Sequence, residues 1–111
     1  MTFERACALT DLPELGARRV DLSGTPVAVV RDGEGTIRAV EDTCTHGAVS
    51  LSEGEVEGCL IECWLHGSQF DLRTGIPRTP PATAPLYVFP VRIEGEDVYV
   101  DVAAPINGPT R

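Results

Sequence analysis

The sequences CTHG at residues 44–47 and CWLHG at residues 63–67 decide how this chain must fold. Each stretch carries one cysteine and one histidine, so together they offer two soft thiolates and two imidazole nitrogens. His46 and His66 are the only histidines in the sequence. A donor set divided between two separate loops becomes useful only when the fold brings the loops together, which predicts a single metal site.

The even division of cysteine and histidine between the loops indicates the kind of metal. Structural zinc motifs usually begin with two closely spaced cysteines, whereas Cys44 is paired with His46 and Cys63 with His66. In a Rieske 2Fe-2S cluster one iron takes both cysteines and the other takes both histidines. The pattern therefore favours a Rieske cluster. Tetrahedral zinc and a lineage that has lost its metal are the alternatives, and the presence of all four ligands argues against the second.

The chain resembles the small Rieske-type ferredoxins, such as the ferredoxin component of bacterial ring-hydroxylating dioxygenase systems. The motifs that carry the resemblance are Cys44-x-His46, Cys63-x2-His66-Gly67 and the run SQFD at residues 68–71. The resemblance spans nearly the whole chain. It implies an all-β antiparallel domain with a small cluster-binding subdomain inserted between core strands, and one 2Fe-2S cluster as cofactor.

The same resemblance assigns roles to individual residues. Cys44 and Cys63 would bind the inner iron as thiolates, while neutral His46 and His66 would bind the outer iron and reach the surface. Ser68 resembles a serine whose hydroxyl is directed at a cluster sulfur in the Rieske subunits of cytochrome bc complexes. A proline-rich cover loop at about 78–86 would lie over the cluster, beyond the two cluster-binding loops at about 43–50 and 62–70.

Departures from those subunits predict a lower reduction potential. The positions of their extra disulfide cysteines are held here by Val49 and Leu65, and Phe70 stands where they carry a tyrosine hydroxyl. One hydroxyl donor is kept, at Ser68, and one is lost. Rieske potentials range from about −150 to +300 mV, and we expect this protein in the lower half of that range.

Composition predicts one β-rich domain over residues 1–111. The chain contains 11 Gly and 9 Pro, has few long helical patterns, and is long enough to bury a core. Without the resemblance, this pattern indicates only an all-β sandwich or barrel. The tail at 103–111 should fray. We expect strands at residues 3–8, 18–22, 25–31, 36–40, 59–62, 69–72, 88–93 and 98–102, with a hairpin turn at Ser23-Gly24.

The N-terminal sequence and the lack of a membrane-spanning stretch predict a cytoplasmic protein. The first residues lack the apolar core of an export signal, and no stretch is long enough to span a membrane. In that compartment metal ligation explains cysteines better than disulfides do. Cys7 and Cys59 are then left over. Cys59 would share a strand face with Cys63, which suggests a role beside the cluster, although a small buried hydrophobic residue is the simpler interpretation of Cys59.

The formal net charge of −8 argues against nucleic acid or an anionic membrane surface as a partner. It favours a basic protein patch, although solubility alone would also explain many of the acids. Trp64, the only tryptophan, is either a docking anchor or a shield packed against the cover loop. The acids near the cluster loops that could steer docking are Glu41, Asp42, Glu53, Glu55, Glu57 and Glu62.

The predicted function is that of a one-electron carrier and not of an enzyme. An oxygenase would need a second iron site, commonly with two further histidines, and this chain has none to spare. The family implies a monomer that takes electrons from a flavin-dependent reductase and passes them to a non-haem iron oxygenase. Service in another redox system or in iron-sulfur assembly stays open, and a zinc-binding interaction module is the alternative from a different class.

Overall fold

The computed structural model describes residues 3–43, 49–65, 67–79, 84–103 and 105–106. Over these residues the chain is almost entirely antiparallel β, as predicted, with two single turns of 3-10 helix, η1 (Leu9–Asp11) and η2 (Leu51–Glu53). No helix among these residues is long and apolar enough to cross a bilayer. The strands are β1 (Glu4–Ala8), β2 (Gly16–Leu22), β3 (Thr25–Arg31), β4 (Ile37–Glu41), β5 (Val56–Glu57), β6 (Leu60–Glu62), β7 (Gln69–Asp71), β8 (Val88–Phe89), β9 (Val91–Glu94) and β10 (Asp97–Val100).

The central sheet has the order β2-β3-β4-β8, and its first hairpin follows the prediction. The hairpin turn is Ser23-Gly24, with φ angles of 51° and 79°. Two consecutive positive φ angles give the twist that a two-residue hairpin needs. Glycine adopts such an angle without strain, which explains its place at the second turn position.

Strand β3 lies at the centre of the molecule because both of its faces are buried. Successive side chains of a strand point to opposite faces. Val27 and Val29 pack in one hydrophobic core with β1 and β10, whereas Ala28 and Val30 pack in a second core with residues of β6 and β7. The central sheet therefore separates the two cores, and the second of them supports the cluster-binding region.

The closing strand is divided at Pro90, which corrects the prediction of one strand over 88–93. Strand β8 pairs with β4, and β9 pairs with β10 in a second sheet of order β1-β10-β9. Proline has no N–H to donate to a ladder, so it is tolerated where a strand leaves one sheet for another. The carbonyl of Pro90 still accepts the N–H of Asp101 at 3.3 Å.

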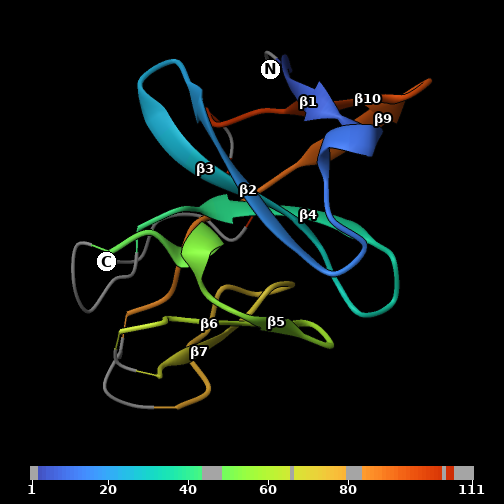
Figure 1. Cartoon of the computed structure of the whole chain (residues 1–111). Coiled ribbons are helices and arrows are strands. Elements are labelled where there is room, and N and C mark those ends of the chain that lie inside the picture. Colours follow the sequence, from blue (N-terminus) through green and yellow to red (C-terminus); the bar gives the residue numbers. More distant parts are fainter. Residues whose placement is uncertain (1–2, 44–48, 66, 80–83, 104, 107–111) are drawn as a thin grey trace.

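The third sheet, β5-β6-β7, is formed by the segment between β4 and β8. It lies below the other two sheets in Figure 1, as the predicted inserted subdomain. Strand β5 was not expected, because Val56 is its only apolar residue among acids. The turn after β3 contacts this sheet closely: the N–H of Gly33 donates to the carbonyl of Gly58 at 2.8 Å, and a Cβ on Gly33 would lie 2.9 Å from the Gly58 Cα.

Asp32 holds that turn in place. Its side chain is fully buried. Oδ1 accepts the N–H groups of Glu34 at 2.9 Å and Thr36 at 3.0 Å, and Oδ2 accepts from Arg38 Nε at 3.2 Å. Burial by itself raises the pKa of Asp32, but these hydrogen bonds outweigh it and hold the pKa below the ordinary value of 3.8.

Asp32→Asn is expected to remove a pH-dependent part of the stability. A carboxylate whose pKa is lowered on folding stabilises the protein above the unfolded value of 3.8, and this contribution is lost as pH falls through the folded value. The substitution should cost about 1–3 kcal/mol of unfolding free energy at pH 7 and less at pH 3. Urea unfolding at both pH values measures this, with the exposed Asp21→Asn as control. An equal loss at both pH values would contradict the assignment.

Candidate metal centre

The second cluster-binding loop is a tight turn that begins at Cys63, immediately after β6. The N–H of Cys63 donates to the carbonyl of Ser68 at 2.7 Å, and the N–H of Gly67 donates back to the carbonyl of Cys63 at 2.8 Å. Gly67 has a φ of 76°, in the left-handed region that favours glycine. The loop therefore returns to the sheet directly, so that β6 and β7 hold both of its ends.

Cys63 meets the requirements of a buried metal ligand. Its side chain is fully buried in the second hydrophobic core, with Ile61, Phe70 and Leu72. Cys63 is also a free cysteine. A soft sulfur donor surrounded by apolar side chains suits an iron-sulfur cluster, because those side chains limit the access of solvent to the metal. The residues present at this end of the sheet thus fit the predicted group.

The other predicted ligands, Cys44, His46 and His66, lie outside the described residues. Ser68, the predicted hydroxyl donor, is described and fully buried. Of the predicted cover loop, residues 80–83 lie outside the described part, and its two ends are described.

The base of the first cluster-binding loop is closed by backbone contacts. Thr43 and Ser50 form an isolated antiparallel bridge, and the N–H of Leu51 donates to the carbonyl of Asp42 at 2.6 Å. Leu51 is fully buried in the same core as Cys63. The described residues that follow the first loop therefore pack in the same core as the start of the second loop.

Asp42 belongs to this support and not to the docking surface suggested by the sequence. Its side chain is 1% exposed, and its Oδ1 accepts the N–H of Ser52 at 2.7 Å. Arg19 Nε lies 3.8 Å from Oδ2. Glu41 is likewise engaged, because its carboxylate accepts the N–H of Tyr87 at 2.9 Å. Burial thus removes Asp42 from the surface, whereas Glu41 is partly exposed and held by this contact.

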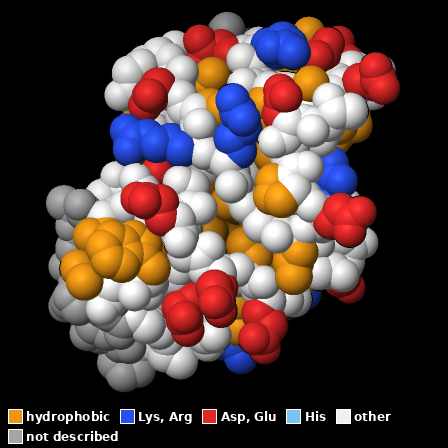
Figure 2. All heavy atoms as spheres, in the orientation of Figure 1, with side chains coloured by type: hydrophobic (Ala, Val, Ile, Leu, Met, Phe, Trp, Pro, Cys, Tyr) orange, Lys and Arg blue, Asp and Glu red, His pale blue; other side chains and the backbone are white. Residues whose placement is uncertain are grey.

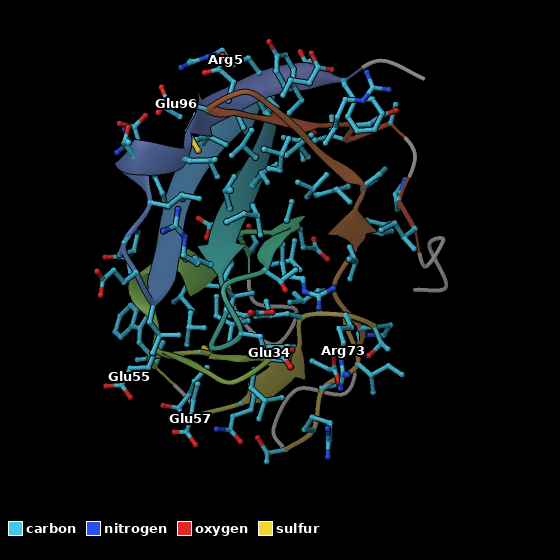
Figure 3. The ribbon with its side chains drawn as sticks, turned by 90° about the vertical axis from the view of Figure 1, so that its right-hand side faces the viewer. Arg5, Glu34, Glu55, Glu57, Arg73 and Glu96 are labelled. Atoms are coloured by element: carbon cyan, nitrogen blue, oxygen red, sulfur yellow. The ribbon has the colours of Figure 1, made fainter. Side chains whose placement is uncertain are left out.

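Of the four remaining acids, Glu62 is partly buried and the other three face solvent. Glu53, Glu55 and Glu57 are exposed. Figure 3 shows Glu55 and Glu57 projecting from the lower edge of the molecule. Figure 2, which is seen from a direction 90° away, shows acidic side chains on the lower half of the molecule beside a hydrophobic patch. Exposed acids therefore lie near the third sheet, whose strand β6 leads into Cys63, and others lie elsewhere on the surface.

Two large apolar side chains next to Cys63 are exposed. Trp64 is 51% exposed and Leu65 is 52% exposed. Large apolar residues at the surface are expected singly, whereas adjacent ones beside a functional group favour an interaction role. The alternative for Trp64, packing against the cover loop, concerns Pro80 and Pro81, which lie outside the described part.

Cys59 differs from the expected buried hydrophobic residue. It lies in the turn before β6, is partly exposed, and its thiol is within hydrogen-bond distance of Glu34 at 3.3 Å and Asp32 at 3.6 Å. Burial and then the Glu34 contact raise the pKa of the Cys59 thiol. A thiol that stays protonated is a poor metal ligand. Cys7, by contrast, is buried in the first core.

One further group of side chains has the spacing of a metal site. The ligand atoms of Asp32, Glu34 and Cys59 lie within 4.8 Å of one another. Figure 3 shows Glu34 beside Arg73 at this contact. These carboxylates already accept hydrogen bonds within the protein. Asp32 accepts from two backbone N–H groups and Arg38, and Glu34 accepts from the Cys59 thiol. This cluster therefore joins the β3–β4 turn to the third sheet.

Comparison with known proteins identifies a family over most of the chain. The family model of the Rieske [2Fe-2S] domain matches residues 2–90. Ferredoxin CarAc of Metapseudomonas resinovorans is 46% identical over 97 residues, which cover 86% of this chain and 90% of the relative. The biphenyl dioxygenase ferredoxin subunit of Pseudomonas sp. strain KKS102 is 46% identical over 103 residues, which cover 91% of this chain and 93% of the relative.

Solved structures agree with these sequence matches. A complex of reduced oxygenase and oxidized ferredoxin in carbazole 1,9a-dioxygenase matches with a TM-score of 0.81 and 45% identity, covering 88% of this chain and 91% of that one. The ferredoxin of carbazole 1,9a-dioxygenase from Nocardioides aromaticivorans IC177 matches with a TM-score of 0.84 and 32% identity, covering 90% of this chain and 97% of that one. The described fold is therefore shared with ferredoxins that serve dioxygenases.

Proposed function

This chain belongs to the Rieske [2Fe-2S] family, and from that premise we propose that it is the electron-carrying ferredoxin of an oxygenase system. It would accept single electrons from a flavin-dependent reductase and deliver them to a non-haem iron oxygenase that hydroxylates aromatic rings. When bound, the Rieske cluster supplies a reversible one-electron couple. The observation that carries the proposal is the fully buried, free Cys63 at the start of a tight loop on the third sheet.

The chain's own residues would hold and tune the cluster. We assign one iron to the two cysteines of the motif and the other iron to the two histidines. The assigned ligands are Cys44, His46, Cys63 and His66. Burial of Cys63 excludes water from its sulfur. The hydroxyl of Ser68, buried in the same turn, is assigned as a hydrogen-bond donor to cluster sulfur.

Trp64 and Leu65 would form the apolar centre of the docking surface for redox partners, since both are exposed beside Cys63. Glu53, Glu55 and Glu57 would form an acidic rim that meets a basic partner. Complementary charge mainly speeds encounter, while a desolvated aromatic anchor contributes most to affinity. This arrangement suits the weak, salt-sensitive complexes of electron carriers.

The same proposal places the protein in the cytoplasm as a monomer with no substrate site of its own. Its substrates would be the redox centres of its partners. The high identity to dioxygenase ferredoxins supports this function over service in iron-sulfur assembly.

Ser68→Ala is expected to lower the midpoint potential by roughly 60–130 mV. A hydrogen bond to a charged acceptor contributes roughly 1.5–3 kcal/mol, and here it would favour the more negative, reduced cluster. Direct electrochemistry of the purified protein measures the shift. Ser52→Ala, on the η2 turn, is the control and should leave the potential unchanged. An unchanged midpoint in Ser68→Ala would show that the hydroxyl is not directed at the cluster.

Electron transfer itself tests the proposed function. Stopped-flow mixing of the protein with NADH and a flavin-dependent ferredoxin reductase should bleach the visible absorbance of the cluster. Subsequent mixing with the oxygenase component should restore it, and both rates should fall as salt is raised. A protein that holds the cluster but exchanges electrons with neither component would contradict the oxygenase assignment.

A further inference from the structure

We propose that the hydroxyl of Thr79 is a positioning group that fastens the described start of the cover loop, residues 78–79, to the second cluster-binding loop and thereby sets the potential and lifetime of the cluster. The inference rests on the proposed function insofar as it concerns the cluster. Thr79 itself touches no proposed ligand in the described part of the chain, so it would act through the backbone of the loop.

The contacts of Thr79 join two separate segments. Its Oγ1 accepts the N–H of Gln69 at 2.9 Å and donates to the carbonyl of Gly67, 3.4 Å away. A hydroxyl can do both at once, because it has one proton and two lone pairs. The two backbone groups flank Ser68, the predicted hydroxyl donor. The position of Thr79 therefore bears on the orientation of Ser68.

Backbone contacts reinforce the hydroxyl on the same side. The N–H of Arg78 donates to the carbonyl of Gln69 at 2.6 Å, and Phe70 and Pro77 form an isolated antiparallel bridge. These contacts guide the chain from the turn at Gly75 back along β7 to Thr79. They hold the main chain near β7, whereas Thr79 reaches across to Gly67 with its side chain.

The other end of the cover segment is fastened to the same hairpin. The N–H of Leu86 donates to the carbonyl of Gly75 at 2.8 Å, and the Leu86 side chain is fully buried in the core that contains Cys63. Both described ends of the segment are thus attached to residues 67–75. The two described ends of the cover segment are therefore hydrogen-bonded to one hairpin, and Thr79 provides a side-chain link at the end next to the second loop.

The substitution Thr79→Val tests the link, because valine keeps the branched shape and removes the hydroxyl. Loss of the acceptor for Gln69 and the donor for Gly67 should make chelator-induced bleaching of the cluster faster by roughly tenfold. The midpoint potential should move to more negative values, in the direction of Ser68→Ala, and the EPR lines of the reduced protein should broaden. Thr79→Ser, which keeps the hydroxyl, should restore all three properties.

Thr74→Val is the matched control, since the Thr74 hydroxyl also accepts a backbone N–H, that of Ile76 at 3.3 Å, within the same hairpin. It should leave the potential and the spectrum unchanged. The inference is overturned if Thr79→Val keeps the wild-type potential, spectrum and bleaching rate, or if Thr79→Ser behaves like Thr79→Val. A wild-type protein that lacks the cluster would instead overturn the proposed function, so the two failures are distinguishable.

Discussion

Replacing Cys63 with alanine is expected to yield a purified protein without its iron-sulfur cluster. The thiolate is one of four proposed ligands, and alanine provides no donor atom that could replace it. The substitution also removes a fully buried side chain from the second core, so the protein should be less stable. Iron analysis and the visible spectrum measure the loss directly.

Cys7→Ala is the matched control for this experiment. Cys7 is also buried and also a free cysteine, but it lies in the first core, on the opposite face of the central sheet. The same chemical change there should reduce stability to a similar degree and leave the iron content at the wild-type level. A Cys63→Ala protein that retained two irons per chain and a Rieske spectrum would refute the assignment of Cys63 as a ligand.

The substitution Trp64→Ala is expected to weaken binding to the oxygenase by roughly 30-fold. An aromatic side chain at the centre of an interface commonly contributes about 2 kcal/mol or more to binding. Trp64 is half exposed, so part of its ring is available to a partner. Calorimetric titration of the oxygenase with reduced and oxidised protein measures the dissociation constants.

Two further results separate docking from shielding of the cluster. If Trp64 is an anchor, the midpoint potential of Trp64→Ala stays at the wild-type value while the dissociation constant rises. Ile93→Ala, which removes another exposed apolar side chain on β9, should leave binding unchanged. Unchanged affinity together with a shifted potential would instead mean that Trp64 protects the cluster from water.

The strands with clear alternation or clear turns were predictable from the sequence. The hairpin at Ser23-Gly24 follows from its turn residues, and the buried run of β3 follows from its valines. The apolar pattern does not predict the break at Pro90, because apolar residues continue on both sides of it. The break exists because β8 pairs with β4 whereas β9 pairs with β10. The missing N–H of proline was the available signal.

The site was predictable in its donor chemistry and less so in its supporting contacts. The spacing of cysteine and histidine indicated a Rieske cluster, in agreement with the family match. The roles of Asp42 and Thr79 could not be predicted, because each depends on contacts between segments that are distant in sequence. In the sequence, Asp42 has the pattern of a solvated loop acid, and only the structure shows that it is buried. Thr79 precedes two prolines, and that pattern indicates no more than a turn.

EPR spectroscopy of the dithionite-reduced protein, together with iron and zinc analysis, tests the central claim most directly. We predict a Rieske-type signal, with an average g value below that of ferredoxins whose cluster has only cysteine ligands, and about two irons per chain. A colourless, EPR-silent protein that contains one zinc would contradict the account, because a zinc site cannot carry an electron.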